Sequence, residues 1–229
     1  MQENEKLFFN LMSFAALALI ALPVGIACVV LGFGFGDSPC VMCWAERITM
    51  IAISLIALFI VRYGPRSGYI AALILMACWG LFNGFLHYSL DGTFGGYLDI
   101  KQGFGLEILG AHTQFWVMVV NFCVFVFLAI IILLSRNLGE IMKKTQEDAY
   151  GKFLAYLPLA RVATLVFIAI VGANCVQAFV TSGPPPYLGS STPPRMSFDA
   201  GKWFWEKDHW NSALDFRFDW NPELPDLPK

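Results

Sequence analysis

Five long apolar runs, separated by shorter polar segments, dominate the pattern of hydrophobic and polar positions along the chain. They cover residues 7–33, 43–63, 69–90, 113–134 and 153–180. Each is near the length that an α-helix needs to cross about 30 Å of hydrocarbon. The first run is longer than the core of a signal peptide and is not followed by an Ala-x-Ala cleavage site. The pattern therefore predicts an all-α membrane protein with five transmembrane helices, the first of them retained.

The composition agrees with a polytopic membrane protein. Hydrophobic residues make up 57% of the chain and charged residues only 14%, and the mean hydropathy is +0.62, which is far more apolar than a soluble domain. The net charge of -2 averages over two sides of a membrane. No basic cluster or motif suggests a nucleic-acid partner.

The polar segments divide the chain into three parts. We expect a four-helix membrane bundle over residues 1–135, a connector and a fifth transmembrane helix over 136–180, and an extramembrane tail over 181–229. In the turn before the second helix, Ser38 is a candidate helix cap and Pro39 occupies a favoured first helical position. In the fifth run, Arg161 can extend its charged end to the membrane surface.

The tail is unusual because it combines prolines with four tryptophans among acidic residues. The tryptophans are Trp203, Trp205, Trp210 and Trp220. Such a density of aromatic side chains is typical of an interface, either with a partner protein or with membrane headgroups. The alternative is a tail that folds back on its own bundle.

The distribution of Lys and Arg predicts the orientation. Lys6, the turn with Arg62 and Arg66, and the connector up to Arg161 fall on one side of the membrane, whereas the turn before Cys40 has no basic residue. By the positive-inside rule, the N-terminus is cytoplasmic and the C-terminus lies in the periplasm or outside the cell. Cysteines on that side are in an oxidising compartment.

The stretch Cys40-Val-Met-Cys43, followed by Glu46 and Arg47, carries the candidate chemistry. On a helix, Cys40, Cys43 and Arg47 share one face, near an N-terminus with positive partial charge. Both the helix end and the guanidinium favour thiolate, which is the reactive form of cysteine. The alternatives are a metal half-site or two inert cysteines. A usual zinc site needs two more Cys or His ligands, and none follow at such spacing, so we expect no metal.

This motif and topology resemble the DsbB family of membrane quinone-linked thiol oxidases. The resemblance covers about residues 7–134 and includes His87, Phe104-Gly-Leu-Glu107 and Trp116. It implies a four-helix bundle in the bacterial inner membrane that takes electrons from a thioredoxin-like periplasmic thiol protein. The acceptor that it implies is a membrane quinone, ubiquinone or menaquinone.

The resemblance also implies roles for individual residues. Cys43 would face the quinone, Cys40 would exchange with an incoming thiol, and Arg47 would be the cation beside the quinone. His87 is a further candidate for cofactor binding, with a hydrogen-bonded histidine at the interface as the alternative. For Arg47, the alternatives are a structural pair with Glu46 or an interfacial position; a charge within a span usually has a partner or a ligand.

The chain departs from the family at one point. Members of the usual kind carry a second cysteine pair between the third and fourth spans, but residues 91–112 contain no cysteine. The remaining cysteines, at positions 28, 78, 123 and 175, lie within apolar runs and are expected to be buried apolar residues.

Two functions follow from these features. The first is an inner-membrane thiol-disulfide oxidoreductase with Cys40 and Cys43 as its redox pair, which we take as the prediction. The second is a non-catalytic DsbB-like accessory subunit that its aromatic tail docks onto a larger membrane complex.

Overall fold

The computed structural model describes residues 3–91, 108–111, 113–134, 157–183 and 196–199. Within these residues, five helical rods are each long and apolar enough to cross a membrane, and the first rod is made of three consecutive helical segments. The elements are α1 (Glu3–Leu19), the π-helical segments η1 (Ile20–Val24) and η2 (Ile26–Gly34), α2 (Val41–Tyr63), α3 (Ser67–Asp91), α4 (Thr113–Leu134) and α7 (Pro158–Ser182). The prediction of an all-α membrane protein with five spans is confirmed. The predicted connector and the aromatic tail from 200 onward lie outside the described residues.

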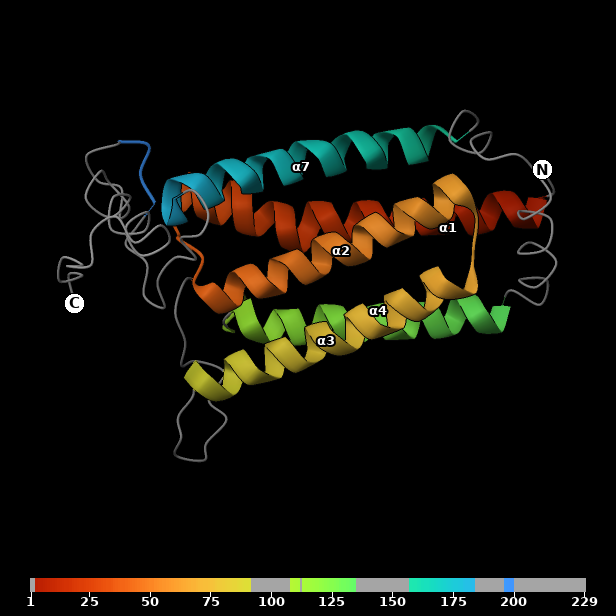
Figure 1. Cartoon of the computed structure of the whole chain (residues 1–229), viewed down its shortest axis with the longest axis horizontal. Helices are drawn as coiled ribbons and strands as arrows, with labels where there is room; N and C mark the ends of the chain where they lie inside the picture. Colours follow the sequence, from red (N-terminus) through yellow and green to blue (C-terminus); the bar gives the residue numbers. More distant parts are fainter. Residues whose placement is uncertain (1–2, 92–107, 112, 135–156, 184–195, 200–229) are drawn as a thin grey trace, which may run out of the picture.

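The helices run alternately up and down beside one another (Figure 1). Helix α1 packs against α2 and α7, and α3 packs against α2 and α4. The fifth helix, α7, therefore lies on the opposite side of α1 and α2 from α3 and α4, and is part of the bundle.

The first rod crosses the bundle without a break although it contains a proline. Pro23 lies inside η1, where it has no backbone N–H to donate and cannot maintain the regular α-helical hydrogen bonds. The rod continues through η1 and η2 to Gly34 as a span of 30 residues. The rod accommodates Pro23 in π-helical turns, which are rare and occur frequently at functional sites.

Helix α2 begins at Val41, two residues later than predicted, and its cap is Cys40. The backbone of Cys40 is extended (φ -70°, ψ 171°), so its sulfur can accept the backbone N–H of Cys43 at 3.2 Å. The prediction that Ser38 caps the helix and Pro39 opens it is wrong. The reactive sulfur itself takes the position in which a serine or aspartate oxygen usually accepts a hydrogen bond.

Close packing of α3 against α4 depends on two glycines. A side chain at Gly80 would collide with that of Asn121, and a Cβ at Gly84 would lie 2.9 Å from Cγ of Met118. Small residues at such positions let two membrane helices approach closely.

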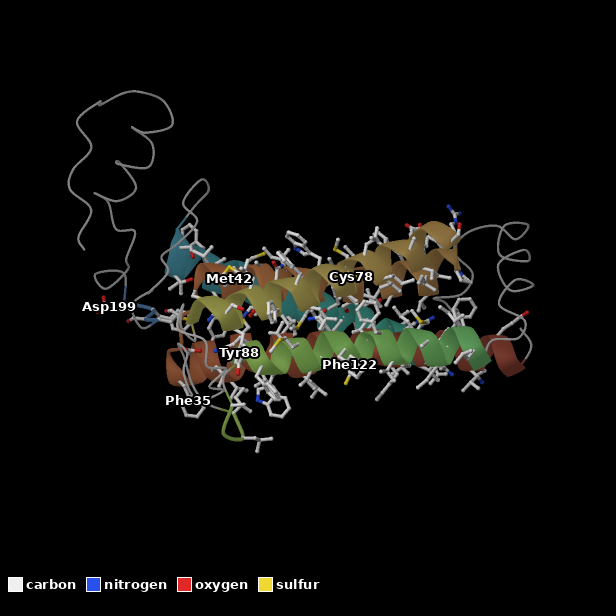
Figure 2. All side chains as sticks on the ribbon, turned by 90° about the horizontal axis from the view of Figure 1, so that it is seen from below. Phe35, Met42, Cys78, Tyr88, Phe122 and Asp199 are labelled. Atoms are coloured by element: carbon white, nitrogen blue, oxygen red, sulfur yellow. The ribbon has the colours of Figure 1, made fainter. Side chains whose placement is uncertain are left out.

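The cysteines inside the spans are mostly not buried. Cys28 is buried, but Cys78, Cys123 and Cys175 are exposed, and Figure 2 shows Cys78 and Phe122 on the outer faces of their helices. The expectation that all four are buried is therefore wrong for three of them. An apolar residue in a span can face lipid as readily as another helix, because lipid tails are as apolar as a protein core.

The two ends of the bundle differ in charge. The turn between α2 and α3, with Arg62 and Arg66, lies at the same end as the start of α7, which carries Arg161 (Figure 1). The start of α2, with Cys40, lies at the other end. This separation is the one that the orientation prediction assumes.

Candidate functional site

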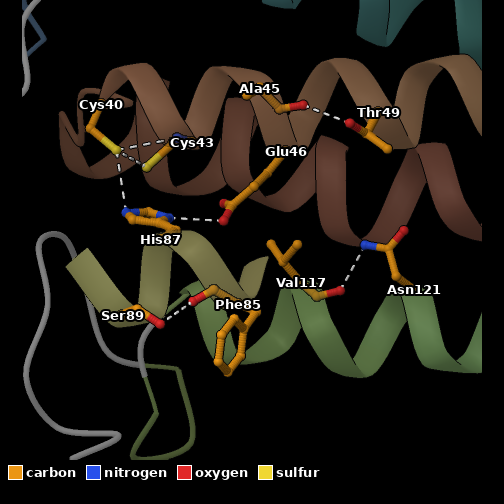
Figure 3. A network of polar contacts seen from close by, with 10 residues as sticks. All are labelled: Cys40, Cys43, Ala45, Glu46, Thr49, Phe85, His87, Ser89, Val117 and Asn121. Atoms are coloured by element: carbon orange, nitrogen blue, oxygen red, sulfur yellow. Dashed lines mark hydrogen bonds and ion pairs between the residues drawn. The ribbon is translucent and has the colours of Figure 1, made fainter. Parts of the chain in front are cut away.

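The two cysteines at the start of α2 meet a histidine from α3. The sulfurs of Cys40 and Cys43 are 2.6 Å apart, and the Cys40 sulfur lies 3.6 Å from Nε2 of His87. The other ring nitrogen, Nδ1, lies 2.8 Å from Oε1 of Glu46 (Figure 3). A carboxylate on Nδ1 fixes the proton there and turns Nε2 toward the sulfur.

This arrangement stabilises the thiolate of Cys40. The pKa of the Cys40 thiol is lowered to about 4, first because Cys43 provides a hydrogen bond to its sulfur and also because His87 provides a second hydrogen bond and positive charge; burial opposes both effects. At neutral pH the reduced site therefore carries a thiolate at Cys40. A thiolate of low pKa is a good leaving group in thiol–disulfide exchange.

Arg47, one turn below Cys43 on α2, points to the opposite side of the helix from His87, toward the first and fifth rods. One terminal nitrogen donates to Oε1 of Gln177 on α7 at 2.6 Å, and the other donates to the carbonyl oxygen of Ala27 in η2 at 3.0 Å. Its guanidinium carbon lies 5.3 Å from the ring centre of Trp44. The side chain is only 7% exposed, so its charge is held by hydrogen bonds inside the bundle.

A cavity of about 250 Å³ adjoins this site. Its walls are mainly apolar and come from the first rod, α2 and α4, and Cys43, Glu46 and Arg47 are among its lining residues. A second, apolar cavity of about 380 Å³ lies deeper in the bundle. Both cavities are lined by Leu22, Pro23, Trp116 and Val120. Together they form an apolar space between the first rod and α4 that begins at Cys43.

The four residues singled out by sequence lie at one end of the bundle, but in two environments. Cys43 and Arg47 line the cavity, whereas Cys40 contacts His87 outside its lining. His87 thus lies against the dithiol and Glu46, and its expected role in cofactor binding stays a prediction. Glu46 pairs with His87, whereas the sequence analysis gave Arg47 as a possible partner of Glu46.

Sequence reasoning missed two contributors, Gln177 and the role of Glu46. Each is a polar side chain within an apolar run, and each is buried, at 0% and 2% exposure. Such residues are costly inside a membrane and are often functional. Their position within apolar runs was the available signal, but it does not reveal their partners.

Cys40, Cys43 and His87 could also hold a soft divalent metal ion. Their three candidate ligand atoms lie within 4.8 Å of one another, and thiolate and imidazole are the donors that zinc prefers. The expectation of no metal rested on the lack of further ligands at short spacing along the chain. The fold supplies one from α3, and the absence of a metal stays a prediction.

Fold and site together define a multi-pass membrane protein with a dithiol at a helix start beside an apolar cavity. Residues 9–99 match the model of the family described as Disulfide bond formation protein DsbB. Over this segment, which is less than half of the chain, the protein is similar to the DsbB family. No curated protein and no solved structure gave a significant match. The matched segment contains Cys40, Cys43, Arg47 and His87, whereas α4 and α7 lie outside it.

Proposed function

We propose that the protein is a quinone-linked thiol oxidoreductase that passes electrons from a periplasmic dithiol through Cys40 and Cys43 to a membrane quinone. The observation that carries this proposal is the division of the dithiol between two environments. Cys43 lines an apolar cavity with Arg47, whereas Cys40 lies outside it with a stabilised thiolate. One sulfur is thus suited to the acceptor and the other to the donor.

The cavities fit a quinone, whether ubiquinone or menaquinone. Their apolar walls suit a ring with a hydrocarbon tail, and Arg47 provides a cation at the same end as Cys43. Arginine has five N–H donors, and two of the nitrogens of Arg47 each use one on Gln177 and Ala27. The remaining donors can face a carbonyl oxygen in the cavity. A quinone bound there supplies an acceptor for two electrons and two protons.

The exchange with the donor is a pair of displacements at sulfur. A donor thiolate attacks the Cys40 sulfur of the Cys40–Cys43 disulfide, so the bond between the two cysteines breaks and Cys43 leaves. The second donor thiolate then attacks its partner sulfur in the mixed disulfide, and Cys40 leaves. The donor becomes a disulfide and the protein a dithiol. The low pKa of Cys40 favours the second displacement because the leaving thiolate is stabilised by Cys43 and His87.

The donor that we propose is a thioredoxin-like periplasmic protein, as the family leads us to expect. Without a cysteine in residues 91–112, it would act on Cys40 directly. Cys40 is only 6% exposed, so exchange with a folded protein requires the protein to open around this sulfur.

The test is quinone reduction by the purified full chain, with dithiothreitol as the donor and a short-chain ubiquinone as the acceptor. We expect steady turnover that Cys40→Ser and Cys43→Ser each abolish. Mass-tag alkylation before and after reduction should also detect a Cys40–Cys43 disulfide in native membranes. Reduced wild-type protein that no quinone reoxidises would refute the proposal. A large stoichiometric partner in the same preparation would then favour the accessory-subunit alternative.

A further inference from the structure

We infer that Gln177 of α7 is a positioning residue that holds the Arg47 guanidinium at the cavity. This inference rests on the proposed function, because it assigns Gln177 a role in quinone reduction. It also gives the fifth helix, which lies outside the family match at 9–99, a direct part in the site.

Both ends of the Gln177 amide are engaged. Its Oε1 accepts from Arg47 at 2.6 Å, and its Nε2 donates to the backbone carbonyl oxygen of Asp37 at 3.2 Å. A guanidinium can only donate and a carbonyl can only accept, so these partners fix the orientation of the amide. Gln177 therefore connects the cavity arginine to the turn that leads into Cys40.

The first rod is shaped to admit this side chain. A Cβ at Gly32 in η2 would collide with the Gln177 amide, so the close approach requires glycine. From the same rod, the Ala27 carbonyl oxygen accepts from the second terminal nitrogen of Arg47. The guanidinium is thus fixed by two acceptors on two different rods, which leaves its other N–H groups for the cavity.

A planar group fixed at two nitrogens has little freedom to rotate. If the Gln177 contact is lost, the guanidinium keeps its charge but can turn about the Ala27 contact and away from the cavity. Preorganised donors stabilise developing negative charge better than mobile ones. Loss of Gln177 should therefore slow electron transfer to the quinone more than it weakens quinone binding.

The experiment compares Gln177→Leu with Asn174→Leu in the full chain, with dithiothreitol and a short-chain ubiquinone. Asn174 is a matched control because it is buried one turn earlier on α7 and donates within its own helix to the Ile170 carbonyl oxygen. We expect Gln177→Leu to lower kcat for quinone reduction on the order of tenfold to a hundredfold, the effect of losing one hydrogen bond to a charged group. KM for the quinone should change less.

Two further readouts separate positioning from folding. The rate at which dithiothreitol reduces the Cys40–Cys43 disulfide should stay unchanged in Gln177→Leu. In an Arg47→Ala background, Gln177→Leu should have no additional effect on quinone reduction, because it acts through Arg47. If Gln177→Leu does not accumulate in membranes, Gln177→Asn, which withdraws the amide by one methylene, should give the same loss.

Three results would overturn the inference. One is wild-type kcat in Gln177→Leu, and another is an equal loss in Asn174→Leu. The third is a slowed disulfide reduction that matches the slowed quinone reduction. A wild-type protein that reduces no quinone refutes the proposed function itself, and the inference with it.

Discussion

Replacing Arg47 by lysine keeps the positive charge at the cavity but removes the planar fork that holds it. Arg47 uses two separate nitrogens, one for Gln177 on α7 and one for Ala27 in η2. The single nitrogen of lysine cannot reach both acceptors and also face the cavity. We expect the variant to insert normally and to reduce quinone slowly.

The size of the effect follows from the contacts. A hydrogen bond to a charged group contributes about 1.5 to 3 kcal/mol, and lysine loses at least one of the two. Since about 1.4 kcal/mol corresponds to a factor of ten in rate, kcat/KM for the quinone should fall roughly tenfold to a hundredfold. Weaker stacking on Trp44, whose ring centre lies 5.3 Å from the guanidinium carbon, acts in the same direction.

The assay is quinone reduction under saturating dithiothreitol, with Arg62→Lys as the control. Arg62 lies on the same helix at the end away from the dithiol, with its guanidinium carbon 6.0 Å from the ring centre of Tyr63. This second substitution should leave kcat/KM unchanged. An Arg47→Lys variant with wild-type kinetics would remove Arg47 from the site.

Three further predictions concern the thiolate, the helix packing and the orientation. In the reduced protein, the ultraviolet absorbance of the Cys40 thiolate should persist as pH falls from neutral and disappear near pH 4, because the pKa of Cys40 is lowered to about 4. The free energy of unfolding that this thiolate contributes is complete above the ordinary thiol pKa near 9 and is lost as pH falls through 4. The His87→Phe substitution should move the absorbance step to higher pH. A step near pH 9 in the wild-type protein would contradict this prediction. Gly80→Leu should lower stability by about 1 to 3 kcal/mol in a thermal unfolding assay because a side chain there strikes α4, whereas Gly68→Ala, which meets open space, should not. A cysteine at Asp199 should react with an impermeant label from the periplasmic side of intact cells, and labelling only after lysis would reverse the predicted orientation.

The spans could be predicted from sequence because a membrane leaves the backbone few choices. Without water to satisfy N–H and C=O groups, an apolar run of this length must be helical. Helix α4 begins and ends where the apolar run 113–134 does. The start of α2 could not be placed as well, because the Cys40 sulfur caps the helix in place of the expected Ser38.

Which side chains within a span are buried could not be predicted as well as the spans themselves. The hydrophobic pattern separates lipid-facing from buried positions poorly, since both are apolar, and this is why Cys78, Cys123 and Cys175 were misjudged. In a soluble protein, the same pattern would have separated water-facing from buried positions.

Some residues of the site are close together in the sequence, whereas their partners lie far away in it. Spacing alone brought Cys40, Cys43 and Arg47 together, because all three lie at the start of one helix. The partners of these residues come from other helices: His87 lies 47 positions after Cys40, and Gln177 lies 130 positions after Arg47. A single sequence identifies such residues as unusual, but their pairing depends on how the helices pack.

The turn before Cys40 is held by two parts of the chain that lie outside the family match. Gln177 donates to the Asp37 carbonyl oxygen, and the backbone N–H of Met196 donates to the Gly36 carbonyl oxygen at 2.9 Å. The Phe198 ring also lies 5.6 Å from that of Phe33. Residues 196–199, the described part of the tail, therefore pack against the bundle. This is the contact expected for these residues if the tail folds back on its own bundle. Since residues 91–112 contain no cysteine, the proposed function requires a donor to act at Cys40 itself, which directly follows this turn.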